Sequence, residues 1–140
     1  MDTLPAAVRS SLMARVRRVT TGPELTVRSA LHALGFRFRL HRRDLPGTPD
    51  VVLSKYKVAV FVQGCFWHQH GGCKKATLPK TRSEFWSAKL SENVARDRRV
   101  RQRLIDMGWR YFDIWECETT PLEALSVRIN ELQTILSANA

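Results

Sequence analysis

The chain has 140 residues and a formal net charge of +10, with 23 Lys and Arg against 13 Asp and Glu. This length suits one domain with a real hydrophobic core, and no apolar run approaches the roughly 20 residues that cross a bilayer. The charge favours a polyanionic partner over a merely solvated basic surface, and the many arginines and four tryptophans favour nucleic acid.

The N-terminus lacks the apolar core of a signal peptide, so we expect a cytoplasmic protein without a membrane partner. Three cysteines cannot all pair within one chain, and the cytosol keeps thiols reduced. Three thiols and one histidine are, however, a complete ligand set for tetrahedral zinc.

The first half of the chain predicts one helix followed by three strands. Residues 1–20 are basic, and we expect a mobile arm or a short, loosely held helix with clustered arginines. Residues 20–23 (Thr-Thr-Gly-Pro) start a helix that covers residues 24–34 and ends at Gly35. Residues 36–40 alternate aromatic and basic side chains, which is typical of a half-exposed strand.

After a loop at residues 45–49, residues 50–53 and 58–62 predict a hairpin, with a central strand in its second arm. Ser83 has the position of an N-cap for a long helix that ends at Gly108. Residues 109–115 predict another strand.

A last helix is predicted after Thr120, with Thr120 as its cap and Pro121 at its first position. Its apolar face comprises Leu122, Leu125, Ile129, Leu132 and Leu136. The order helix, three strands, helix, strand, helix contains no internal repeat and no domain boundary, so we expect a single domain over residues 21–140.

The loop after the central strand gathers metal-type side chains. Cys65, His70 and Cys73 lie in this loop, and Cys117 follows the strand that ends at Trp115. These four residues suit a structural zinc site that joins the loop to the far end of the sheet. His68 competes with His70 for the metal, and the alternative is three unrelated buried thiols.

Asp50 is a candidate ligand for Mg²⁺ because it stands at the head of a strand, directly after Pro49. The predicted hairpin brings Gln63 and Gly64 beside it, where further oxygens could share the ion. The commoner role of an aspartate after proline is to cap a turn.

If His70 binds the metal, His68 is free to accept a proton from an attacking water. Asp97 is a candidate partner for it, because a period of 3.6 residues places Asp97 within the apolar stripe of the long helix, where a carboxylate needs a partner. Asn93 lies on the same face. The alternative is that Asp97 pairs with a neighbouring arginine.

Two aromatic residues, Phe66 and Trp67, follow Cys65 in this loop, and a third, Trp86, lies at the start of the long helix. Aromatic side chains usually belong to the core. Phe66 and Trp67 are adjacent in a loop flanked by glycines, however, and both cannot easily point inward. Wedging between base pairs is a plausible use for them.

Taken together, these residues resemble the very short patch repair (Vsr) DNA mismatch endonucleases. The resemblance spans residues 9–118, and its most specific motifs are Cys-Phe-Trp-His at 65–68 and Arg-Asp-Arg-Arg at 96–99. Further matching segments are Glu24-Leu25 with Arg28, Leu45 to Asp50, Glu84 to Trp86, Gly108 to Arg110, and Trp115 to Cys117.

The resemblance implies a restriction-endonuclease-like α/β core, with a mixed central sheet flanked by helices. It implies Mg²⁺-dependent nicking of double-stranded DNA on the 5′ side of the thymine in a T:G mismatch, the product of 5-methylcytosine deamination. Other repair proteins are further candidate partners. We expect a monomer, associated with the nucleoid when it acts.

The resemblance also implies roles for particular residues. Asp50 would hold the catalytic Mg²⁺ with the backbone carbonyl of Val62, His68 would be the general base oriented by Asp97, and Glu24 would lie in the active-site surroundings. Cys65, His70, Cys73 and Cys117 would hold structural Zn²⁺. The DNA contacts would come from Phe66, Trp67, Trp86 and the arm residues Arg15, Arg17 and Arg18.

The chain departs from the family pattern at three places. Gln63 stands where the family usually has a second active-site histidine, and a glutamine cannot take up a proton at neutral pH. Thr48 replaces a usual basic residue, and Gly71-Gly72 changes the length of the zinc loop.

Gln63 keeps two alternatives open. The first is an endonuclease of the same fold with altered specificity, and the second is a catalytically weakened, zinc-stapled DNA-binding protein. Charge alone also permits an RNA-binding protein, although this would leave Asp50, His68 and Asp97 without a role.

Overall fold

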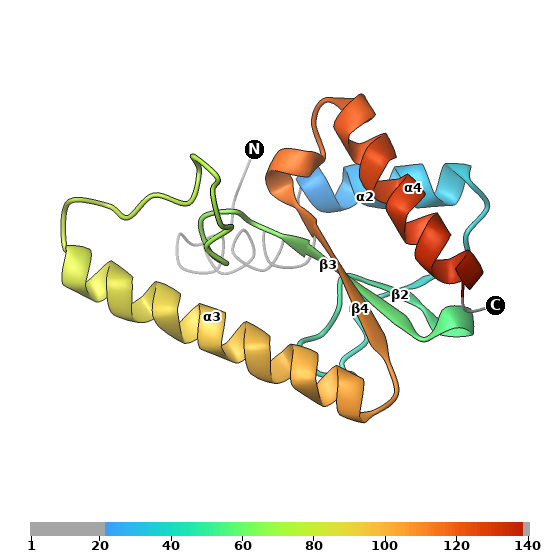
Figure 1. The fold of residues 1–140 in the computed structure, drawn as a ribbon, viewed down its shortest axis with the longest axis horizontal. Helices are drawn as coiled ribbons and strands as arrows, with labels where there is room; N and C mark the ends of the chain where they lie inside the picture. Colours follow the sequence, from blue (N-terminus) through green and yellow to red (C-terminus); the bar gives the residue numbers. More distant parts are fainter. Residues whose placement is uncertain (1–21, 139–140) are drawn as a thin grey trace, which may run out of the picture.

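The computed structural model of the chain describes residues 22–138 (Figure 1). Within this range the helices are α2 (Gly22–Ala33), α3 (Ser83–Asp106) and α4 (Leu122–Ala138). The strands are β1 (Arg39–Leu40), β2 (Val51–Leu53), β3 (Val58–Gln63) and β4 (Arg110–Trp115). The predicted order of helices and strands is thus confirmed. No helix in the described part of the chain is long and apolar enough to span a membrane.

The four strands form one mixed sheet in the order β1-β2-β3-β4. β1 and β2 are antiparallel, as are β2 and β3, where Val51 pairs with Val60. β3 and β4 are parallel, with Gln63 opposite Trp115 at their carboxyl ends. Helix α3 provides the long connection that a parallel pair requires. The loops that follow β3 and β4 therefore leave the sheet at the same end.

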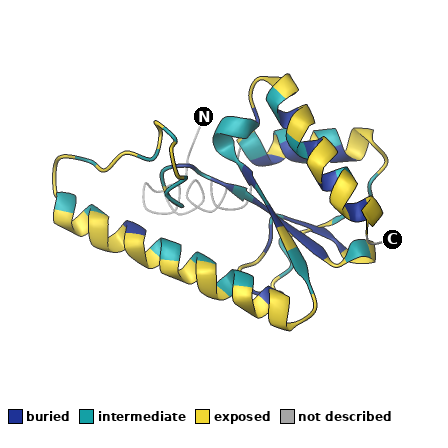
Figure 2. Cartoon of the chain, in the orientation of Figure 1, coloured by how far each residue is buried: buried dark blue, intermediate teal, exposed yellow. Residues whose placement is uncertain are grey.

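Helices cover both faces of the sheet (Figures 1 and 2). Alternate residues of β3 point to opposite faces. Val58 and Val60 pack with residues of α2 and α4 in the larger hydrophobic cluster, whereas Ala59 and Phe61 pack with Leu104 of α3 in the smaller one. A three-layer arrangement results, with α2 and α4 on one side of the sheet and α3 on the other.

The loop before β2 packs closely against α3. Gly47 in this loop has a φ of +76°, and a Cβ atom built there would lie 2.6 Å from Cγ1 of Val100. Glycine is therefore required both by the backbone conformation and by the short distance to the helix. This contact fixes α3 relative to the segment that leads into Asp50.

Four sequence predictions differ from the structure in detail. Residues 36–38 are not in a strand, so the predicted strand shrinks to β1, although Phe36 and Phe38 still pack against the core. Ser83 lies inside α3, and the N-cap is Arg82, whose backbone is left-handed with a φ of 55°.

In the last helix, Leu122 is 69% exposed and lies outside the apolar face of α4. The first helical residue of α4 is Leu122, not Pro121, although the carbonyl of Pro121 accepts the first bonds of the helix.

Candidate functional site

Asp50 lies immediately before β2, at the edge of the mixed sheet. Its Oδ2 accepts a hydrogen bond of 2.7 Å from the backbone N–H of Val62 on β3. This hydrogen bond holds one carboxylate oxygen against the sheet. The side chain is 18% exposed, so the carboxylate stays within reach of solvent.

A second carboxylate and an imidazole lie next to Asp50. Glu24, in the first turn of α2, is nearly buried, and its Oε2 accepts from Arg28 at 3.0 Å. The same oxygen lies 3.1 Å from Nε2 of His41, which is 3.9 Å from Oδ1 of Asp50. One ligand atom from each of Glu24, His41 and Asp50 lies within 4.8 Å of the others. Two acidic groups and one nitrogen in this arrangement suit a divalent cation.

The pKa values of both carboxyl groups in this cluster are raised. Burial raises the pKa of Asp50 to about 7, and the nearby charge of Glu24 adds to the effect. Burial also raises the pKa of Glu24 above its ordinary value of 4.5. A cation between the two would favour the ionised forms, because opposite charge offsets both burial and mutual repulsion.

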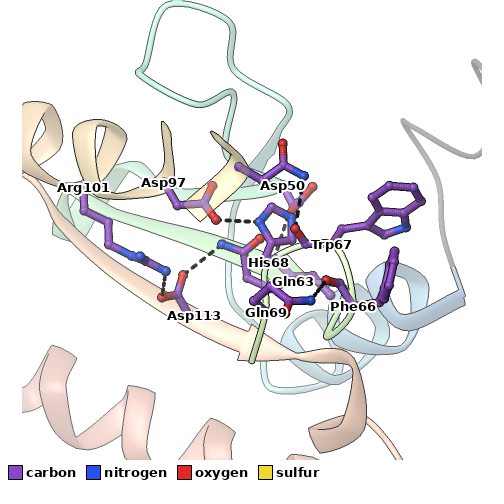
Figure 3. A network of polar contacts seen from close by, with 11 residues as sticks. Asp50, Gln63, Phe66, Trp67, His68, Gln69, Asp97, Arg101 and Asp113 are labelled. Carbon is purple, nitrogen blue, oxygen red and sulfur yellow. Dashed lines mark hydrogen bonds and ion pairs between the residues drawn. The ribbon is translucent and has the colours of Figure 1, made fainter. Parts of the chain in front are cut away.

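The turn after β3 brings His68 to the same end of the sheet. The N–H of His68 donates to the carbonyl of Gly64 at 3.1 Å, which closes the turn. Nδ1 of His68 lies 2.7 Å from Oδ2 of Asp97 on α3 (Figure 3). An ionised carboxylate can only accept, so Nδ1 carries the proton and the lone pair of the imidazole lies on Nε2. Asn93, one turn earlier on α3, donates to the carbonyl of Trp67 at 3.2 Å.

Gln63 belongs to a hydrogen-bond network that is separate from the pair of His68 and Asp97. Its Nε2 donates to Oδ1 of Asp113 on β4 at 3.4 Å, and Oδ2 of Asp113 accepts from Arg101 of α3 at 2.8 Å (Figure 3). The side chain of Gln63 is thus held by Asp113 of β4, which Arg101 of α3 holds in turn, and Asp50 is not its hydrogen-bond partner among these contacts.

The four predicted zinc ligands lie together beyond the carboxyl ends of β3 and β4. One ligand atom from each of Cys65, His70, Cys73 and Cys117 lies within 4.8 Å of the others. The Nδ1 atom of His70 lies 3.8 Å from Sγ of Cys65 and 3.5 Å from Sγ of Cys117. The His70 ring stacks on Trp115 with centroids 4.2 Å apart, which holds the plane of the imidazole. His68 is not a member of this cluster, because its Nδ1 contacts Asp97.

Two of the three thiols in this cluster have raised pKa values. Burial raises the pKa of Cys117 to about 12 and also raises that of Cys65. The backbone N–H of Lys75 lowers the pKa of Cys73. A bound metal replaces thiol protons directly, so three sulfurs and one imidazole nitrogen form a candidate metal-binding group.

The three predicted aromatic residues form a cluster at the edge of this region. The ring centroid of Phe66 lies 5.1 Å from that of Trp67 and 5.6 Å from that of Trp86. Phe85 extends the cluster, 5.4 Å from Trp86. Trp67 is 47% exposed, which agrees with the expectation that Phe66 and Trp67 cannot both point inward.

The structure thus brings together most of the residues that the sequence singled out. His41 was missed, because it stands among arginines in the basic segment from Arg37 to Arg43 and belongs to no metal-ligand motif. The signal that could have found it is strand register, because an antiparallel partner of β2 places the residue after Leu40 opposite Asp50. The arginines Arg15, Arg17 and Arg18 lie outside the described residues.

The site defines an α/β protein with two candidate metal-binding clusters at one end of its sheet. Comparison with known proteins gives the family. The family model described as DNA mismatch endonuclease Vsr matches residues 1–75. The type II nicking enzyme V.XorIIP of Xanthomonas oryzae pv. oryzae is 48% identical over 94% of this chain and 96% of that protein.

The DNA mismatch endonuclease Vsr of Escherichia coli (strain K12) is 40% identical, over 93% of this chain and 86% of that protein. The type II nicking enzyme V.NmeAIP of Neisseria meningitidis is 37% identical, over 94% of this chain and 93% of that protein. The chain therefore belongs to the Vsr family of DNA mismatch endonucleases. This membership confirms the enzyme class that the sequence predicts, a DNA endonuclease.

Proposed function

We propose that this protein nicks double-stranded DNA on the 5′ side of the thymine in a T:G mismatch, by Mg²⁺-dependent hydrolysis of the phosphodiester. The observation that carries the proposal is the pairing of His68 with Asp97 at 2.7 Å, at the end of the sheet where Asp50 lies. A metal-type carboxylate and an oriented imidazole are the two groups that metal-assisted hydrolysis needs.

His68 is the general base in this proposal. Because Asp97 holds the proton of Nδ1, Nε2 can take a proton from a water molecule as that water attacks phosphorus. Asp97 also stabilises the imidazolium that forms. The pair therefore moves one proton in a fixed direction, from water to Nε2.

Asp50 is the main ligand of the catalytic Mg²⁺, with the backbone carbonyl of Val62 as a second oxygen. The donor set fits the ion, because the buried carboxylate of Glu24 and the partly buried one of Asp50 lie close together and burial raises the pKa of both. When bound, Mg²⁺ supplies charge that stabilises the negative oxygens of the transition state. Glu24 completes the negative surroundings, while Gln63 holds the strand ends through Asp113.

Zn²⁺ is the proposed occupant of the cluster formed by Cys65, His70, Cys73 and Cys117. Three thiolates and an imidazole are a typical structural zinc set, without an open position for a substrate. His68 lies between two of these ligands in sequence, so the metal would hold the turn that carries the general base.

The aromatic cluster supports recognition of a distorted duplex. Phe66, Trp67 and Trp86 are proposed to wedge into the base stack at the mismatch, where unstacking costs least. The arm residues Arg15, Arg17 and Arg18 are proposed to follow the phosphates. In this arrangement residues 1–20 are the arm and residues 21–140 form one restriction-endonuclease-like domain that acts as a monomer in the cytoplasm, on the nucleoid.

The test is strand-specific cleavage of a labelled duplex with one T:G mismatch, beside matched T:A and C:G duplexes, with and without Mg²⁺. We expect a Mg²⁺-dependent nick beside the mismatched thymine, which Asp50→Ala abolishes. Asp106→Ala, an exposed carboxylate at the end of α3, is the matched control and should cut normally. Equal cutting of all duplexes would instead indicate altered specificity, and binding without a nick would indicate a site that has lost its chemistry.

A further inference from the structure

His41 lies beside Asp50 because of the register of the sheet. Leu40 pairs with Val51 in the antiparallel ladder between β1 and β2, so the next pair outward is His41 opposite Asp50. The backbone N–H of His41 donates to the carbonyl of Asp50 at 3.4 Å. The φ of His41 is 47°, a left-handed conformation that is uncommon outside glycine but that histidine adopts more often than most residues. The imidazole is thus placed by strand pairing and not by a long loop.

The position of the His41 ring suits a shared cation. Nε2 lies 3.1 Å from Oε2 of Glu24 and 3.9 Å from Oδ1 of Asp50. Ligands bound at about 2.1 Å to one octahedral ion are separated by about 3 Å, so small side-chain shifts would bring all three atoms onto a common ion. The side chain of His41 is 21% exposed, and those of Glu24 and Asp50 are less exposed.

We propose that His41, through Nε2, and Glu24 join Asp50 as direct ligands of the divalent ion, and that the His41 nitrogen makes the site favour Mn²⁺ over Mg²⁺. The inference rests on the proposed function for the location of the metal, and it adds two ligands and a preferred ion to that site. Mg²⁺ strongly prefers oxygen ligands and keeps its water, whereas Mn²⁺ accepts imidazole more readily.

The competing explanation is that His41 only positions Glu24 through a hydrogen bond. His41→Gln separates the two roles, because the amide can still donate to Glu24 but offers a metal ion only a carbonyl oxygen, so that no nitrogen is bound directly. Arg28 also bonds Glu24, so the variant keeps this carboxylate anchored.

The experiment uses the full chain without DNA, with one equivalent of Zn²⁺ bound to the cysteine cluster. Electron paramagnetic resonance measures the affinity for Mn²⁺, and competition measures that for Mg²⁺. Electron spin echo modulation reports a directly bound ¹⁴N. We expect the nitrogen signal in the wild type and its loss in His41→Gln. In this variant the Mn²⁺ affinity should fall by about tenfold or more, and the Mg²⁺ affinity by less than about threefold.

Two variants control for other histidines. His68→Gln and His32→Gln, the latter at the exposed end of α2, should keep the nitrogen signal. A wild-type spectrum without bound nitrogen, or an equal loss of both affinities in His41→Gln, would overturn the proposal. Nicking of the T:G duplex is measured separately. A nitrogen signal without nicking would reject the proposed function alone, and nicking without the signal would reject this inference alone.

Discussion

Asp97 on α3 lies 2.7 Å from the imidazole of His68, in the turn after β3, although 29 residues separate the two in the chain. The contact exists because α3 crosses back over the face of the sheet to reach β4, and its middle turns pass above the end of β3.

Asp97→Asn should remove most of the nicking activity while the fold is kept. An asparagine cannot hold the imidazolium by charge, and its amide can donate to the nitrogen and favour the wrong tautomer. We expect the single-turnover nicking rate to fall by about 10²–10⁴. Unchanged Kd for the T:G duplex would assign the loss to the chemical step, and a rate within threefold of wild type (about 0.6 kcal/mol) would argue against His68 as the base.

Asp50 should give the metal-free protein an unusual dependence of stability on pH. Its pKa rises from 3.8 to about 7 on folding, so between these values the native chain binds more protons than the unfolded chain. The free energy of unfolding must then fall as pH rises through this window. Urea denaturation at several pH values should reveal a smaller fall in Asp50→Asn.

The matched control for this pH dependence is Asp44→Asn. The Arg42 guanidinium lowers the pKa of Asp44 below 3.8, so its contribution is lost only as pH falls through still more acidic values. In Asp44→Asn, the free energy of unfolding should therefore change with pH above pH 4 in the same way as in wild type. If Asp50→Asn leaves the pH dependence of the free energy of unfolding unchanged, a group other than Asp50 causes that dependence.

Removal of metal from the cysteine cluster should destabilise the whole domain. A metal present at about 1,000 times its Kd contributes about 4 kcal/mol to the native state. We expect one equivalent of zinc by elemental analysis, and a lower Tm in Cys73→Ser or after chelation. Thr77→Ala, in the same loop, should keep both the zinc and the Tm. A zinc-free protein with an unchanged Tm would contradict the proposed site.

Trp67→Ala should weaken mismatch binding by about 1–3 kcal/mol if the ring stacks on a base. The ring is 47% exposed and contacts Phe66 and Trp86, so its removal costs the core little. Fluorescence anisotropy with T:G and T:A duplexes measures the effect. Tyr111→Ala removes a ring that is 37% exposed near the opposite end of the sheet, and should leave both affinities unchanged.

Gly47→Ala should lower both stability and activity. The new methyl group would lie 2.6 Å from Val100 in a left-handed backbone, which costs about 1–3 kcal/mol by overpacking. It would also push α3, and with it Asp97, away from the loop before Asp50. Gly71→Ala is the control, because nothing lies within 4 Å of its added Cβ. A Gly47→Ala protein with wild-type Tm would contradict this account of the contact.

The sequence predicts the long elements of the fold well, because their apolar period is strong. The ends of α3 and α4 are less predictable. Ser83 has good cap chemistry, yet the chain turns at Arg82 in a left-handed conformation and no side-chain cap forms. Phe36 and Phe38 alternate like a strand, but they contribute side chains to the core without joining the sheet.

In the candidate site, too, the residues that sequence spacing brings together could be predicted, whereas those that strand pairing brings together could not. The metal-type cluster could be predicted because Cys65, His70 and Cys73 are neighbours in the chain, and Asp97 because a helical period predicts its face. His41 could not be found in this way, since its place depends on a strand pairing of only two residues. The catalytic roles of these residues stay predictions.

The position of His68 between Cys65 and His70 has a further consequence. A metal bound to those two ligands would cross-link the ends of a short loop, and the proposed general base, His68, belongs to that loop. The conformational entropy of this turn would then be lost during folding and metal uptake, before any substrate arrives. DNA would meet a base that is already in position, and binding energy from the duplex would remain available for distorting the mismatch.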